Sequence, residues 1–163
     1  MSEETAAAGE EATQREVGLR KVYIKDFSFE SPGSPAVFSK PDFRPNTNMN
    51  LRTSNSKVDD DLYEMVLTIT LDAKQDDETA FLVELQQAGL FVIRGYDQVE
   101  LATILGSFCP ATLFPYAREV ISSSVQRGGF PDLLLQPIDF DALFRRSQQE
   151  AAKQQAAAAN NTH

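Results

Sequence analysis

The sequence predicts an α+β domain in which helices pack on one face of an antiparallel sheet. In the first half of the chain, apolar and polar residues alternate with a period of two, the pattern of half-buried strands. In the second half, apolar residues recur at helical spacing. Strands that come first and helices that follow favour segregated elements over repeated β-α units. The 163 residues correspond to a single domain.

The first predicted strand covers residues 19–30, and its parity separates two sets of side chains. One set comprises Tyr23, Phe27 and Phe29, and the other comprises Asp26, Ser28 and Glu30. The segment 31–45 contains four prolines, which favour a loop or an edge segment. Alternation resumes at 48–53, where Met49 and Leu51 share one face.

The strongest strand signal lies in residues 62–73, where apolar side chains occupy one face almost without interruption. The acidic segment 74–78 then predicts a turn, and 79–87 predicts the second strand of a hairpin. In this strand, Phe81, Val83 and Leu85 lie on one face, and Leu82, Glu84 and Gln86 lie on the other. Gly89 is interpreted as a bulge.

Helical spacing begins at residues 97–108, and Cys109-Pro110 is expected to interrupt it. A second helix is predicted over 111–129, with Pro115 in a first turn or at a kink and Gly128-Gly129 as its end. An extended connector follows at 130–138. Asp139 or Asp141 is expected to cap a last helix. The chain is thus divided into an acidic disordered tail (1–18), a folded domain (19–147) and a frayed Ala/Gln-rich tail (148–163).

Composition excludes several classes of function. The 24 acidic residues outnumber 15 basic ones, for a net charge of −9, which argues against nucleic-acid partners. Because Cys109 is the single cysteine and His163 the single histidine, neither an intrachain disulfide nor a Cys/His zinc cluster can form. No apolar run approaches the length needed to insert in a membrane, and the acidic start does not resemble a secretory signal. A cytoplasmic location is predicted.

Catalytic interpretations find little support. The chain has no phosphate-binding loop, dinucleotide-binding glycine motif or zinc-protease motif, so no cofactor and no metal are predicted. Cys109 is interpreted as a small buried apolar residue. The acidic runs 59–61 and 76–78 are interpreted as solvated turns rather than cation sites. An enzyme built on an acid pair such as Asp59 and Glu64 is the competing hypothesis.

Two surfaces stand out as possible binding sites. Asp26, Glu30, Leu82 and Glu84 are predicted on polar strand faces, where they form either an ordinary solvated surface or a docking patch for a basic partner. Many large apolar residues also lie in or near the proline-rich connectors, and some of them are expected to line a groove or an oligomer interface rather than the core. They are Phe38, Phe43, Met49, Leu51, Phe91, Phe130, Leu133, Leu135, Phe140, Leu143 and Phe144.

Several long motifs connect this chain to a known family. They are YIKDFSFESP (23–32), DDLYEMVLTIT (60–70), ETAFLVELQQAGLF (78–91), FCPATLFPYAREVISS (108–123) and RGGFPDLLLQPIDFDALF (127–144). In this order and spacing, over residues 20–146, they resemble SecB, the family of bacterial protein-export chaperones. The resemblance implies a four-stranded antiparallel sheet with helices on one side and a homotetramer built as a dimer of dimers. It also implies an ATP-independent chaperone that holds precursor proteins unfolded and delivers them to SecA for export across the inner membrane.

The resemblance also assigns roles to residues. It places SecA binding at Asp26, Glu30, Leu82 and Glu84, the oligomer interface at Phe81, Val83, Leu85 and Gln87, and the client groove at Met49, Leu51 and Phe144. The acidic C-terminal tail of many family members, which contributes to SecA binding, is replaced here by an Ala/Gln-rich segment. This difference leaves one alternative open, a SecB-like chaperone recruited to another client such as an antitoxin.

Overall fold

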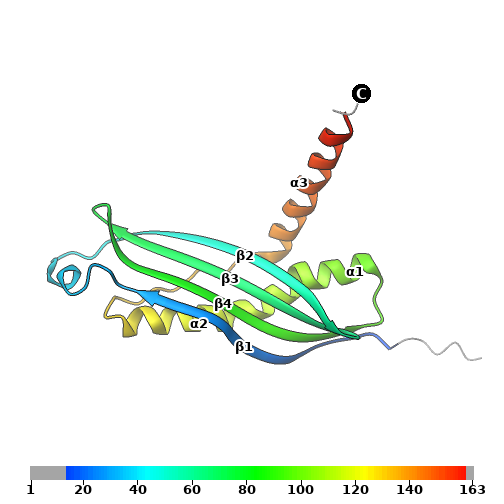
Figure 1. Ribbon diagram of the computed structural model, residues 1–163, viewed down its shortest axis with the longest axis horizontal. Helices are drawn as coiled ribbons and strands as arrows, with labels where there is room; N and C mark the ends of the chain where they lie inside the picture. Colours follow the sequence, from blue (N-terminus) through cyan, green and yellow to red (C-terminus); the bar gives the residue numbers. More distant parts are fainter. Residues whose placement is uncertain (1–13, 161–163) are drawn as a thin grey trace, which may run out of the picture.

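A twisted four-stranded sheet, covered by helices on one face, is the framework of the computed structural model, which describes residues 14–160 (Figure 1). The strands are β1 (Glu16–Glu30), β2 (Asn46–Asp59), β3 (Leu62–Gln75) and β4 (Glu78–Arg94). They pair antiparallel in the order β1-β4-β3-β2. The predicted fold class is confirmed.

The two acidic runs form the tight turns of this sheet. Asp61 has a positive φ of 56° between β2 and β3. Asp76 and Asp77 have φ values of 52° and 61° between β3 and β4, as a two-residue hairpin turn of the primed type requires. Their interpretation as turns is confirmed. The 31–45 connection, with the short helix η1 (Ala36–Ser39), takes the chain from the β1 edge to the β2 edge.

Strand β1 departs from the predicted parity because its register shifts twice. The shifts lie between Leu19 and Lys21 and between Ile24 and Asp26. The second shift leaves Lys25 as an extra residue, so that Tyr23 pairs with Ala88 while Asp26 pairs with Gln86. Ala88 and Gln86 are two residues apart on β4 and point to the same face, so Tyr23 and Asp26 share that face. The prediction that Tyr23 shares a face with Phe27 and Phe29 is therefore wrong, because an extra residue reverses the alternation.

The first predicted helical region is longer and more continuous than expected. Helix α1 (Gln98–Thr103), the π-helix η2 (Ile104–Phe108) and helix α2 (Cys109–Arg127) follow one another without an interruption at Cys109-Pro110. Pro110 lacks the N–H group that an α-helix would pair with the carbonyl of residue 106, and the wider π-turn directly precedes it. Pro115 lies inside α2.

Gly89 is not a bulge, because β4 pairs without a register shift there. A Cβ atom at this position would lie 2.7 Å from Cδ2 of Leu113. The residue is glycine because helix α2 approaches the sheet closely at this point.

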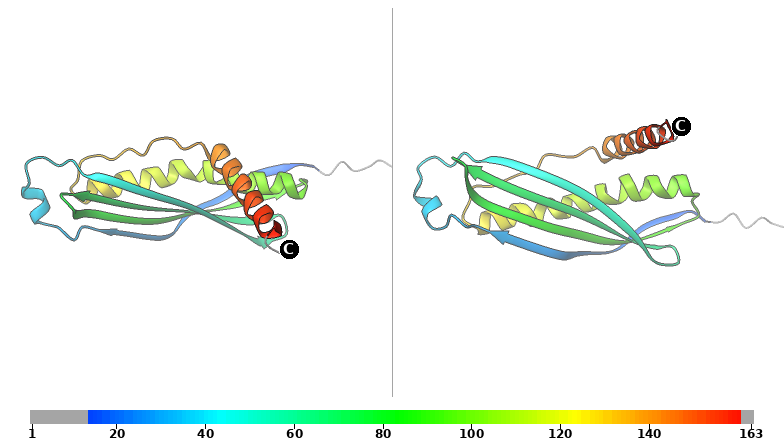
Figure 2. Two further views of the ribbon diagram at one scale, coloured as in Figure 1. Left: turned by 90° about the horizontal axis from the view of Figure 1, so that it is seen from above. Right: turned by 45° about the horizontal axis from the view of Figure 1, so that its top comes forward.

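The core fills the space between the sheet and the helices. We call the side of the sheet that carries Met65, Leu67, Phe81 and Val83 the helix-covered face, and the side that carries Asp26, Glu30, Thr70 and Glu84 the open face. The helices contribute Leu113, Ala117, Ile121 and Val125 to the same core. Helix α3 (Phe140–Asn160) buries only Phe140 and projects from the body of the molecule (Figure 2).

The predicted N-terminal limit of the folded domain needs correction, whereas the fraying of the Ala/Gln-rich tail stays a prediction. Strand β1 already includes residues 16–18, which were assigned to the N-terminal tail, and α3 continues as helix to Asn160. Asp139 is its cap, since its Oδ1 accepts a hydrogen bond from the N–H of Ala142 at 2.9 Å. The predictions for residues 1–13 and for His163 lie outside the described residues.

Candidate functional site

The structure brings the four predicted docking residues together on the open face. Strands β1 and β4 are neighbours, Glu30 is paired with Leu82, and Asp26 is paired with Gln86, two residues along from Glu84. Leu82 leaves 36% of its surface exposed. Among residues 14–160, no salt bridge engages Asp26, Glu30 or Glu84. The patch thus combines unpaired carboxylates with one exposed apolar side chain.

A shallow depression of about 280 Å³ extends this patch across the sheet. Glu30, Leu82 and Glu84 border it on one side, and Asn50, Thr70 and Asp72 border it on the other. Asp72 lies beside Leu82 in the β3–β4 register, and its Oδ2 is 3.4 Å from Nζ of Lys74. Asp72 was not among the docking residues predicted from the sequence. The available signal was the alternation within residues 62–73, which places Asp72 on the polar face of that strand.

A hydrogen-bonded cluster bounds the acidic patch along β1. The hydroxyl of Tyr23 donates to Oε1 of Glu64, and Nζ of Lys25 lies 2.9 Å from both carboxylate oxygens of Glu64. These two donors hold the pKa of Glu64 below its usual value, and burial next to Glu64 raises the pKa of Tyr23 to about 12. Glu64 is therefore charged and paired, in contrast to the unpaired carboxylates of Asp26 and Glu84.

The acid pair proposed for an enzyme does not have the electrostatics of a general acid. A catalytic acid needs a raised pKa, whereas Tyr23 and Lys25 lower that of Glu64. Cys109, the other candidate for chemistry, is buried in the core, and burial raises the pKa of its thiol to about 12. Its interpretation as a buried apolar residue is confirmed.

The four residues assigned to the oligomer interface lie on the helix-covered face. Phe81, Val83, Leu85 and Gln87 are at most 2% exposed within a single chain. Phe81 packs against the rings of Phe29 and Phe130, with ring centroids 5.9 and 4.8 Å apart. While this fold is intact, a second copy cannot touch these side chains directly. Their role in assembly stays a prediction. Because they are buried, they could affect an interface only by positioning the helix that covers them.

Two of the three predicted groove residues line one groove of about 540 Å³. Leu51 contributes from β2 and Phe144 from α3, together with Leu101 and Leu105 from α1 and η2. Met49 lies on the same face of β2, two residues from Leu51, and is 38% exposed, but it does not line this groove. The lining is mixed: Leu51, Leu101, Leu105 and the first two turns of α3 supply its apolar part, and its polar residues are Thr53, Asn55, Gln98 and Ser147.

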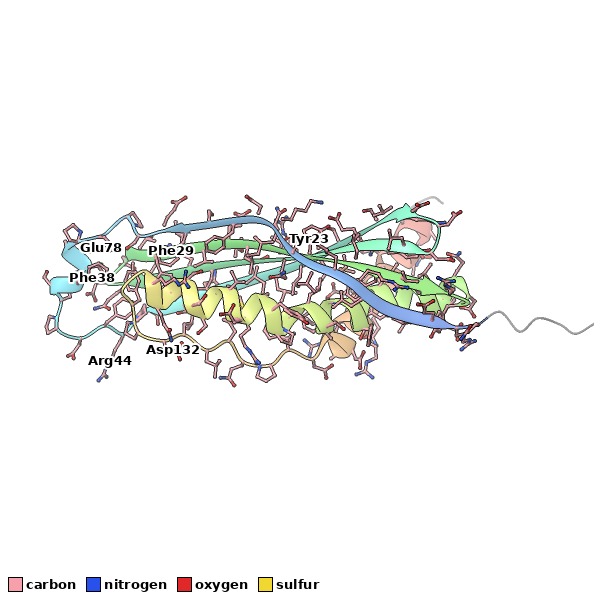
Figure 3. All side chains as sticks on the ribbon, turned by 90° about the horizontal axis from the view of Figure 1, so that it is seen from below. Tyr23, Phe29, Phe38, Arg44, Glu78 and Asp132 are labelled. Atoms are coloured by element: carbon pink, nitrogen blue, oxygen red, sulfur yellow. The ribbon has the colours of Figure 1, made fainter. Side chains whose placement is uncertain are left out.

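A second group of aromatic residues gathers where α2 ends. The rings of Phe29, Phe38, Phe43 and Phe81 all contact Phe130, and Figure 3 shows Phe29 and Phe38 at this end of the molecule. A Cβ atom at position 128 would overlap the ring of Phe29, so only glycine fits at this position, where α2 ends. Most of the connector phenylalanines are thus core residues, while Phe38 remains 49% exposed.

Comparison with known families decides the identity of the chain. The model of the family described as "Preprotein translocase subunit SecB" matches residues 10–151. The chain belongs to the SecB family. Family relatives named "Protein-export protein SecB" include those of Nitrosococcus oceani, 44% identical over 94% of this chain and 93% of the relative, and Hahella chejuensis, 51% identical over 86% and 88%. That of Marinobacter nauticus is 45% identical over 93% and 94%.

A solved structure shares the fold at low sequence identity. A SecB-like chaperone of Mycobacterium tuberculosis, in complex with a peptide from the HigA1 antitoxin, aligns with a TM-score of 0.59 and 15% identity. The alignment covers 75% of this chain and 87% of that one. At this identity the likeness supports the fold alone. Within residues 14–160, no helix is long and apolar enough to span a membrane.

Proposed function

We propose that this chain is a cytoplasmic, ATP-independent export chaperone that binds unfolded precursor proteins in its groove and presents them to SecA through its open face. Membership of the SecB family is the observation that carries the proposal. The groove and the acidic patch supply the chemistry that such a role needs.

The groove offers contacts that many sequences can use. Leu51, Leu101 and Phe144 present apolar surface, and the hydrophobic effect is non-directional, so no particular client sequence is required. A folded protein has already buried its own apolar side chains. Selectivity for unfolded chains therefore follows from exposure rather than from a recognition code.

The open face suits a basic partner, and SecA is the partner that the family resemblance implies. Unpaired Asp26, Glu30 and Glu84 would attract basic side chains, and Leu82 would add an apolar contact at the centre. Because these carboxylates are exposed, their attraction depends on ionic strength.

A homotetramer is the assembly we propose, with the outer side of the helices in its interfaces. Val99, Phe108 and Tyr116 are 77%, 51% and 48% exposed on these helices. Ile24 and Phe27 are also exposed on β1, which is an edge strand of the sheet. A second copy would remove this apolar surface from water. Phe81, Val83, Leu85 and Gln87 would then act by fixing the position of α2 beneath the interface.

The chaperone function is tested with a client that cannot fold, reduced and carboxymethylated α-lactalbumin. We expect saturable binding of this client and no binding of the native, oxidised form. Leu51→Lys should weaken binding about tenfold or more, because it places a charge in the apolar groove. Ser54→Lys is the matched control, because Ser54 lies on the open face of the same strand.

Equal affinity of both variants would place the client outside the groove. Binding of native and unfolded α-lactalbumin with equal affinity would overturn the chaperone proposal itself. Failure of the unfolded client to bind, together with tight capture of another client such as an antitoxin, would favour the recruited-chaperone alternative.

A further inference from the structure

Helix α3 is attached to the rest of the protein almost entirely through its first two turns. Phe140 is buried, Ala142 and Phe144 are half-buried, and residues 145–160 are exposed. The element against which it mainly packs is η2. Figures 1 and 2 show the remainder of α3 projecting away from the sheet and from α2. The direction of this long helix is thus set at its base.

Two neighbouring residues of η2 make that attachment. The ring of Phe144 lies so close to Gly106 that a Cβ atom at position 106 would overlap it. Next to it, the buried hydroxyl of Ser107 donates a hydrogen bond to Oδ1 of Asp141. Because the acceptor is charged, this bond is stronger than one between neutral groups. A π-turn is wider than an α-turn, and this one carries both contact residues.

The same two turns of α3 form one wall of the groove. Phe140, Leu143, Phe144 and Ser147 line the groove, and they face Leu51 and its neighbours on β2. A tilt of α3 at its base would move this wall relative to β2, while the sheet and α2 keep their positions. The contacts at residues 106 and 107 therefore lie where a small change alters the width of the groove.

We propose that Gly106 and Ser107 are positioning residues that hold α3 at a fixed angle and thereby set the groove width available to a client. The proposal rests on the proposed function, in which this groove is the client site. Gly106 borders the groove, but neither Ser107 nor Asp141 lines it. Ser107 can therefore act on clients only through α3.

The angle of α3 can be measured directly with spin labels. Ser56→Cys on β2 and Gln148→Cys on α3 place labels on exposed positions outside the groove lining. The native Cys109 is buried with a raised pKa, so it should resist labelling in the folded protein. Samples are mixed with excess unlabelled protein, so that pulsed dipolar spectroscopy reports distances within one chain.

Ser107→Ala is expected to broaden the distance distribution between the two labels, because the charged hydrogen bond is lost. Gly106→Ala should shift the distribution, since the added methyl group displaces the ring of Phe144. Asp141→Asn keeps a neutral acceptor for Ser107, so it should broaden the distribution less than Ser107→Ala does. Ser122→Ala is the matched control, because it removes a bond of the same type, from Ser122 to Asp132 at 2.8 Å, far from α3.

The functional readout is the affinity for carboxymethylated α-lactalbumin. Ser107→Ala should raise its Kd by about tenfold, Asp141→Asn should raise it by less, and Ser122→Ala should leave it near the wild-type value. A distance distribution unchanged by both Ser107→Ala and Gly106→Ala would overturn the positioning role. A broadened distribution with an unchanged Kd would leave η2 as the support of α3 and overturn its role in setting the groove width for clients, whereas the Leu51→Lys variant tests separately whether the groove is the client site.

Discussion

Replacing Phe81 with alanine separates a direct role in assembly from a role in the core of each chain. Phe81 is 2% exposed, stacks on Phe29 and contacts Phe130 at a centroid distance of 4.8 Å. A buried Phe→Ala substitution costs about 3–5 kcal/mol, and each aromatic pair adds about 0.5–1.5 kcal/mol to such sites. We therefore expect the free energy of unfolding to fall by about 4–5 kcal/mol, near the upper end of that range. This is a large part of the ~5–15 kcal/mol by which a typical domain is stable.

The assay combines guanidinium unfolding at fixed protein concentration with mass measurement by light scattering under native conditions. We expect Phe81→Ala to lose stability and assembly together. Leu82→Ala, on the opposite face of the same strand, should cost under about 0.5 kcal/mol and keep the native mass. A Phe81→Ala protein that keeps full stability but forms smaller species would refute the reasoning, because it would mean that Phe81 contacts a second copy directly.

Three further predictions follow from the sheet and its surface. Tyr23→Phe should lower stability at pH 7, and its gap to wild type should close as pH falls through the lowered pKa of Glu64; a gap that persists in acid would contradict the pairing of these two residues. Gly89→Ala should cost about 1–3 kcal/mol through its clash with Leu113, and much less in a Leu113→Ala background, as a double-mutant cycle would measure; additive costs would exclude the clash. SecA affinity should fall as salt rises, in contrast to the affinity for unfolded clients, and equal salt dependence of the two would argue against a charged docking face.

The sheet was largely predictable because most of it obeys one simple periodicity. Residues 62–75 pair in register over almost their whole length, so alternate side chains reach the same face and the pattern survives in the sequence. Strand β1 was harder, because the extra residue at Lys25 reverses the parity and moves Tyr23 to the open face. A single inserted residue leaves no mark in composition or hydropathy.

The candidate site was predictable in part. Asp26 and Glu84 could be placed on polar faces from alternation, and the strand order β1-β4 then made them neighbours. Alternation also places Asp72 on a polar face, but its position beside Leu82 depends on the pairing of β3 with β4, which no local pattern encodes. Similarly, the support of α3 depends on a π-turn at Gly106 and on contacts over long sequence separations, to Asp141 and Phe144.

The central claim, that this chaperone docks its export partner through the open face, is tested most directly by calorimetric titration with purified SecA. We expect saturable binding to the wild-type protein and at least tenfold weaker binding to the Asp26→Lys/Glu84→Lys variant. The Asp42→Lys/Asp60→Lys variant makes the same change in net charge at exposed positions outside that patch and should bind as wild type does. Equal loss of affinity in both variants, or none in either, would contradict the assignment of the open face.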